Sequence, residues 1–262
     1  MKDFKMAHIV PISHLFETEN NQYHMCLAHL VNNTRYAEHF SKCVKAGKYV
    51  LMDNGEAEGK QLNFENLFKA YMRIHPKEIV LPDKLFDSKQ TIYKSQTFLD
   101  EMTKRNLSYK VLAVPQGHNL SEWEECAKVF LSDRRINTIG ISKFLNIITE
   151  DKYIRFKALE KLEKYIKLYN REDVEVHLLG CEEGPIIVNE CHKHFLFVRG
   201  CDTAFAYLAA QSNIHISLEN VRRPKGIIDF INGKYYANTI LEINSFNKLA
   251  GVKDNGYSSK WR

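Results

Sequence analysis

The sequence predicts an α/β fold, a single (β/α)8 barrel of the TIM type that is irregular at its ends. Short apolar segments alternate with amphipathic ones, and the six best-defined strands begin near residues 49, 78, 109, 137, 175 and 196. This spacing is close to the ~30-residue period of a βαβ unit. The chain has 262 residues, and such a barrel typically needs about 250. No linker or low-complexity segment interrupts it, so we expect one domain over residues 1–262.

The first half of the chain contains clear start and stop signals. Gly47 suits the end of a helix, Pro76 stops another, and Asp87 with Gln90 fits a capping box. The apolar segments 6–12 and 23–31 are both strand candidates, of which the second is better placed. The other expected elements are a helix over 34–46, a strand over 49–53, a helix over 63–75, a strand ending at Asp83 and a helix over 87–106.

The second half repeats the same alternation. Ser121 and Glu124 predict a helix start, and the Lys- and Glu-rich segment 151–169 predicts a long surface helix. The expected elements are strands over 109–117, 137–142, 175–180 and 195–203, and helices over 121–130, 151–169, 185–194 and 241–250. With 23–31 these make seven strands. The eighth stays open between 215–218 and the residues near Ile227.

The composition of the chain indicates the partners and the cellular compartment to expect for this barrel. The formal charge of +5 and pI near 8.7 are compatible with a polyanionic partner without requiring one. No apolar run approaches the ~20 residues of a membrane span, and the N-terminus lacks a signal-peptide core. The six scattered cysteines predict reduced thiols in a cytoplasmic protein, with no disulfide framework and no closed zinc site.

Polar residues end five of the predicted strands. They are Asp53, Asp83, Gln116, Ser142 and Asp202. In a closed barrel the carboxyl ends of the strands meet at one mouth, where catalytic residues lie. Three carboxylates and an amide there, without a metal-ligand spacing, predict acid–base or covalent chemistry. A glycosidase fits less well, because only Trp123 and Trp261 offer sugar-stacking surfaces.

Six segments at these strand ends also carry a resemblance to a known family. They are YVLMDNG, IVLPD, VLAVPQG, TIGIS, VHLLG and VRGCDT. In this order they resemble the tRNA-guanine transglycosylase superfamily, most of all its short, phage-type DNA-guanine transglycosylases, over roughly residues 23–225. The resemblance implies an irregular (β/α)8 barrel with pentosyltransferase activity. It would exchange a guanine in nucleic acid for a free 7-deazaguanine base, as in queuosine-like modification, through a covalent Asp–sugar intermediate and without a cofactor.

The resemblance also implies roles for individual residues. Asp202 would be the nucleophile and Asp53 the general acid/base. The groups that would bind the base are the Asp83 carboxylate, the Gln116 amide, the backbone N–H groups near Gly117 and Gly140, and the Leu179 side chain. No residue is expected to bind a metal. Arg222, Arg223 and Lys225 are candidates for phosphate contacts.

The chain departs from the family pattern in three places. It lacks the C-x-C-x-x-C…His zinc site of the tRNA enzymes, which favours DNA over tRNA as the partner. Phe205 stands where the family's D-x-x-D pattern has its second Asp, and Ala57 replaces an aromatic residue. A tRNA-directed (queuine-type) member of the superfamily and a non-catalytic nucleic-acid-binding barrel subunit stay open. So do a homodimer, an accessory protein, and a simple helix cap or turn as the role of Asp202 or Asp53.

Overall fold

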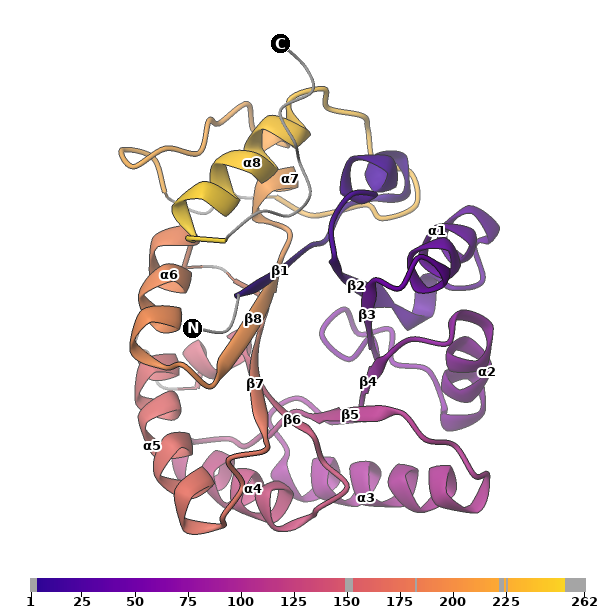
Figure 1. Cartoon of the computed structure of the whole chain (residues 1–262), viewed down its shortest axis with the longest axis vertical. Coiled ribbons are helices and arrows are strands. Elements are labelled where there is room, and N and C mark those ends of the chain that lie inside the picture. The colour runs from indigo at the N-terminus through magenta and orange to yellow at the C-terminus, as the bar shows by residue number, and fades with distance from the viewer. Residues whose placement is uncertain (1–3, 149–152, 182, 222–223, 225, 253–262) are drawn as a thin grey trace.

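Eight parallel strands form the centre of the molecule. The computed structural model describes residues 4–148, 153–181, 183–221, 224 and 226–252. The strands are β1 (Lys5–His8), β2 (Tyr23–Leu27), β3 (Tyr49–Asp53), β4 (Glu78–Val80), β5 (Lys110–Ala113), β6 (Thr138–Ser142), β7 (Glu175–Leu179) and β8 (Val198–Thr203). Their order is β1-β8-β7-β6-β5-β4-β3-β2, so the sheet curls into a nearly closed barrel with β1 and β2 at the seam (Figure 1). The predicted (β/α)8 barrel is confirmed.

The eighth strand lies at the N-terminus and not near the C-terminus. β1 pairs with β8, with Ala7 opposite Asp202, so the first and last strands of the chain are neighbours. The first strand candidate is therefore a barrel strand like the second. The alternatives near residues 215–218 and Ile227 are wrong, because the described residues of that region form only an isolated bridge between Ser217 and Asn220.

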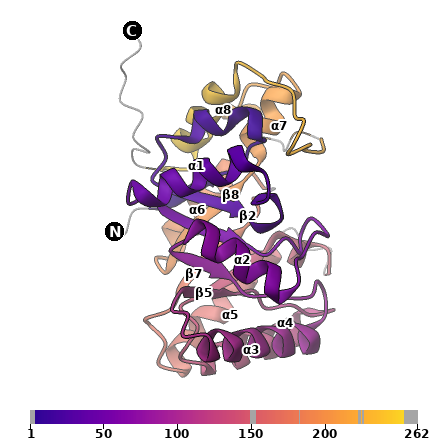
Figure 2. The same cartoon turned by 90° about the vertical axis from the view of Figure 1, so that its right-hand side faces the viewer.

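Helices cover the outside of the barrel. They are α1 (Thr34–Lys45), α2 (Phe64–Ile74), α3 (Ser88–Lys104), α4 (Leu120–Ser132), α5 (Ile154–Leu168), α6 (Pro185–His194), α7 (Phe205–Gln211) and α8 (Thr239–Leu249), with 3-10 turns at Ile12–Thr18, Ala28–Leu30 and Lys143–Asn146. Figure 2 shows α1, α2 and α3 following one another along one side of the barrel. No helix in the described ranges is long and apolar enough to span a membrane.

Side-chain capping explains the starts of α1, α2, α3 and α4. The Asp87 carboxylate accepts a hydrogen bond from the Gln90 backbone N–H (2.9 Å) and one from the Gln90 side chain (2.8 Å), as the capping box predicts. The expected start of α4 at Ser121 is wrong. Asn119 caps that helix instead, its side chain accepting from the Glu122 N–H at 3.0 Å. Asn is as good a cap as Ser, so the signal two residues earlier takes precedence.

All six cysteines are buried free thiols, as the sequence predicts.

The amino-terminal end of the barrel is closed by a buried ionic network. Glu78 begins β4, is fully buried and contacts the Arg199 guanidinium. It also accepts hydrogen bonds from Tyr49 (3.0 Å) and Thr138 (2.6 Å). Arg199 reaches Glu175 as well, at 3.1 Å. Each charge therefore has a partner, which a buried ion needs to be tolerated.

Candidate active site

One large pocket opens at the carboxyl-terminal ends of the strands. Its volume is about 460 Å³, within the usual size range of ligand sites. The polar strand-end residues expected to meet at one mouth all line it: Asp53, Asp83, Gln116, Ser142 and Asp202. Leu179 lines it too, and Leu27, Phe205, Ile228 and Phe230 contribute apolar walls. The pocket thus combines largely apolar walls with a few acidic groups that converge on it.

Asp53 ends β3 and begins a tight loop. Its carboxylate accepts a hydrogen bond from the Gly55 N–H at 2.8 Å, and the Asn54 side chain accepts one from the Glu56 N–H at 2.8 Å. Gly55 has φ +85°, and a Cβ there would lie 2.9 Å from the Lys60 carbonyl oxygen. Only glycine fits this position without strain. The Asp53-Asn-Gly segment is therefore a turn, and the turn holds the carboxylate at the pocket wall.

The surroundings of Asp53 disfavour its charged form. Its pKa is raised well above the ordinary value, first by desolvation and then by the negative charge of Glu58, with smaller contributions from Asp83 and Asp202. The pKa of Glu58 is itself raised, by desolvation and by Asp202. A carboxyl group whose protonated form is favoured in this way is suited to act as a general acid.

Asp83 is buried between two amides. The Asn54 Nδ2 donates to one carboxylate oxygen at 2.8 Å and the Gln116 Nε2 to the other at 2.6 Å. Burial raises the pKa of Asp83 to about 6, although both hydrogen bonds oppose the shift. The amides fix the orientation of the carboxyl group but do not neutralise it. Asp83 can therefore still accept hydrogen bonds from N–H or O–H groups of a ligand.

Asp202 is held from the barrel interior. Its Oδ1 lies 3.1 Å from the Gly180 N–H and 3.2 Å from the His177 Nε2. The His177 Nδ1 lies 3.2 Å from the Tyr23 hydroxyl. Burial lowers the pKa of His177, so the consistent assignment is a neutral ring that donates from Nε2 to Asp202 and accepts from Tyr23 at Nδ1. These hydrogen bonds hold the Asp202 carboxylate in place at the pocket wall.

The start of the helix after β8 defines the roles of Asp202 and Phe205. The helix after β8 begins at Phe205, and its N-cap, Ala204, has no side-chain cap, so Asp202 is not a helix cap. Phe205 lines the pocket and packs against Phe246, with ring centroids 5.5 Å apart. It is therefore an apolar wall at the position where a second carboxylate would have faced the site.

Several predicted residues lie elsewhere. Gly117 packs against α4, where a Cβ would lie 2.5 Å from the Trp123 nitrogen. Gly140 makes room inside the barrel for Leu112 and Leu179. Neither glycine is among the residues that line the pocket. Arg222, Arg223 and Lys225 fall outside the described residues, so their contact with phosphates stays a prediction.

Lys143 is a pocket residue that the sequence analysis missed. It follows the last residue of β6 and lines the pocket. Its stem lies against Gly180, where φ is +66° and a Cβ would come within 2.7 Å of the Lys143 Cδ. Its position directly after Ser142, a strand end already recognised, was the available signal. Lys143, like Lys60, brings a positive charge to a pocket wall that also carries carboxyl groups.

The described part of the chain contains one group of three side chains with metal-ligand geometry. It consists of His24, His39 and Cys43, whose candidate ligand atoms all lie within 4.8 Å of one another. These residues do not line the pocket. They belong to β2 and α1, on the outside of the barrel.

Comparison with known proteins shows the fold. The chain is similar to the YdjI aldolase from Escherichia coli (12% identity, 97% of this chain and 93% of that chain, TM-score 0.60). It is also similar to an HpcH/HpaI aldolase from Desulfitobacterium hafniense (11% identity, 81% and 90%, TM-score 0.54). A third similar structure is tryptophan synthase from M. tuberculosis (9% identity, 96% and 93%, TM-score 0.53). No protein-family model and no curated protein matches the sequence.

These findings overturn the family resemblance. The similar structures are aldolases and tryptophan synthase, and no tRNA-guanine or DNA-guanine transglycosylase is among them. The inference of a pentosyltransferase that exchanges guanine for 7-deazaguanine is therefore wrong. The physical reason is that a short apolar strand followed by a polar residue or glycine is a feature of many barrels, because it follows from strand burial and mouth chemistry. Six such segments in register describe the fold more than the reaction.

Proposed function

We propose that the protein is a barrel enzyme of the aldolase or lyase type. In this proposal Asp53 and Asp202 move protons at the carbon beside a carbonyl group of a small substrate. The observation that carries the proposal is that both carboxyl groups line one pocket, where the pKa of Asp53 is raised and Asp202 accepts a hydrogen bond from the Gly180 N–H. The named aldolases share the fold at 11–12% identity, which supports the architecture only. The assignment of chemistry rests on the pocket.

The carboxyl groups of Asp202 and Asp53 have different roles in this proposal. Asp202, which accepts from the Gly180 N–H and from His177, serves as the base that removes a proton from the substrate. Asp53, whose pKa is raised, serves as the acid that returns a proton to the product. Tuning two carboxyl groups by their surroundings is how one site can hold both an acid and a base.

Lys143 and Asp83 complete the binding site. When the C–H bond breaks, its electron pair moves toward the carbonyl oxygen, where negative charge develops. The Lys143 ammonium, which lines the pocket, would stabilise that charge. Asp83, oriented by Asn54 and Gln116, would accept from hydroxyl or N–H groups at the other end of the substrate. A cytoplasmic location, consistent with six free thiols, is part of the proposal, whereas a nucleic-acid partner stays an untested prediction.

Hydrogen–deuterium exchange tests this function without knowledge of the full substrate. The protein is incubated in D₂O with small aldehydes, ketones and 2-oxo acids, and loss of the α-proton is followed by NMR. We expect exchange with at least one class. Asp53→Asn and Asp202→Asn should each slow it by about 100-fold or more, because acid–base groups typically contribute 10²–10⁴.

Glu172→Gln is the matched control, because this carboxylate is exposed and outside the pocket. It should leave the exchange rate unchanged. Absence of exchange with every compound class, or exchange that persists in both Asp variants, would overturn the proposal.

A further inference from the structure

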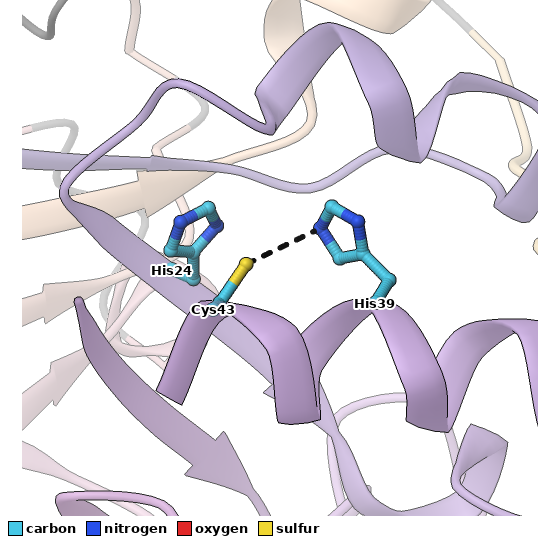
Figure 3. A group of neighbouring side chains, drawn as sticks. All are labelled: His24, His39 and Cys43. Atoms are coloured by element: carbon cyan, nitrogen blue, oxygen red, sulfur yellow. Dashed lines mark hydrogen bonds between the residues drawn. The ribbon is translucent and has the colours of Figure 1, made fainter. Parts of the chain in front are cut away.

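A second group of chemically active side chains lies on the outer face of β2. Alternate residues of a strand point to opposite sides, and Met25 and Leu27 line the pocket. His24 therefore points away from the barrel interior, toward α1. There it meets His39 and Cys43, which lie four residues apart and so on the same face of the helix. Figure 3 shows the Cys43 sulfur between the two imidazole rings.

We propose that His24, His39 and Cys43 bind a single divalent transition-metal ion such as Zn²⁺, which would join β2 to α1. Two imidazoles and one thiolate form a ligand set that suits zinc. The site is separate from the barrel pocket, so the proposal does not depend on the proposed reaction.

The distances between the ligand atoms support a shared ion. All three candidate atoms lie within 4.8 Å of one another, and the His39 Nε2 is 3.8 Å from the Cys43 Sγ. Zn–N and Zn–S bonds at a tetrahedral angle would place such atoms roughly 3.6 Å apart. Small side-chain movements would complete the geometry. Three protein ligands leave the fourth position of the tetrahedron for water.

His24 also has the outer contact that metal-binding histidines usually have. Its Nε2 lies 2.8 Å from the Asn21 carbonyl oxygen, so the neutral ring carries its proton there and keeps a free lone pair on Nδ1. A backbone carbonyl that fixes the tautomer in this way is typical of metal ligands.

Cys43 supplies the thiolate of the ligand set. Binding of the ion would form the Zn–S bond as the S–H proton leaves to solvent, so the thiolate charge offsets part of the ion's charge. His39 is half-buried while His24 and Cys43 are buried, which gives the ion an entry path at His39.

Cobalt substitution tests the site directly. Chelator-treated protein is titrated with Co²⁺ and followed by absorption, since a thiolate ligand gives a sulfur-to-cobalt charge-transfer band. We expect one Co²⁺ per chain, displacement by Zn²⁺, and a Zn²⁺-dependent rise in Tm. Cys43→Ala should remove the charge-transfer band, and His39→Ala should weaken binding by about 100-fold or more, in line with the effect of even outer-shell changes.

Two control variants separate this site from adventitious binding. Cys126→Ala removes a buried thiol on α4, and His118→Ala removes an exposed imidazole. Both should bind Co²⁺ like the wild type. Circular dichroism of the half-buried His39→Ala variant shows whether the fold is kept. Absence of a thiolate band in the wild type, or an unchanged band in Cys43→Ala, would overturn the proposal.

Discussion

Glu78 and Asp83 are buried carboxylates only five residues apart, yet they lie at opposite ends of the barrel and have opposite partners. Glu78 meets a guanidinium, a phenol and a hydroxyl. The Asp83 carboxylate accepts from the amides of Asn54 and Gln116. Within the described residues, no side-chain carboxylate of Asp53, Asp83 or Asp202 forms an ion pair with Lys or Arg. Asp202 contacts the His177 ring, which is neutral.

This difference separates stability from function. At the amino-terminal end the charges are compensated, so the network stabilises the folded barrel provided that it stays complete. At the mouth the carboxyl groups are buried without compensation, which costs stability and raises the pKa of Asp53 and Asp83. Such uncompensated groups in a pocket are characteristic of functional sites. Four predictions would break or sharpen this comparison.

The largest effect is expected from Arg199→Met. The change leaves the fully buried Glu78 without its cation, and the loss of one partner of a buried pair typically costs about 3–5 kcal/mol. The measurement is the free energy of unfolding from urea denaturation at pH 7. Arg35→Met, at an exposed position of α1, is the control and should change it by less than about 0.5 kcal/mol. Equal effects of both changes would show that the network is not structural.

A smaller effect is expected in the pH dependence of stability. The pKa of Asp83 is raised to about 6, above its value of ~3.9 in the unfolded chain. The folded state therefore binds the proton more tightly, and this stabilisation is present below pH ~4 and is lost as the pH rises through about 6. The lost stability should be about 2–3 kcal/mol.

Asp83→Asn should remove this part of the slope, because asparagine does not titrate. Glu172→Gln, at an exposed site, should keep it. The measurement is the free energy of unfolding, taken from urea denaturation curves recorded between pH 4 and 7. A wild-type slope that Asp83→Asn leaves intact would assign the slope to other carboxyl groups and contradict the environment described for Asp83.

Loss of the contact between Tyr23 and His177 in the barrel interior should lower the free energy of unfolding modestly. Tyr23→Phe removes the hydroxyl that reaches the His177 Nδ1 at 3.2 Å and leaves a buried acceptor unpaired, at a cost of about 1–3 kcal/mol. Tyr93→Phe is the matched control, since Tyr93 is 71% exposed. Urea denaturation should distinguish the two variants. Indistinguishable stabilities would mean that the Tyr23–His177 contact contributes nothing.

How far the sequence predicted this molecule depends on how local each signal is. Asp53, Asp83, Gln116, Ser142 and Asp202 were placed at one mouth correctly, because each follows a short apolar strand and the fold brings strand ends together. The segment 6–12, which contains most of β1, was a strand candidate, but the eighth strand was expected near residues 215–218 or Ile227. β1 has only four residues, and its membership in the barrel depends on pairing with β8, almost two hundred residues away.

Other features depend on packing that no local pattern records. His177 is buried in the barrel interior, and its contact with Asp202 links two neighbouring strands. His39 and Cys43 are visible as a helical i,i+4 pair, whereas His24 joins them only because β2 packs against α1. The reaction class could not be predicted, because strand-end carboxylates serve many chemistries on this fold.

The smallest expected change tests the central claim most directly. If the mouth carboxylates are kept for function and cost stability, Asp53→Asn should unfold at pH 7 with a free energy equal to that of the wild type or up to about 1 kcal/mol higher. The amide oxygen can still accept from the Gly55 N–H, while the repulsion by Glu58, Asp83 and Asp202 disappears. A loss of 2 kcal/mol or more, on the order of a broken structural contact, would place Asp53 with the structural carboxylates and contradict the account.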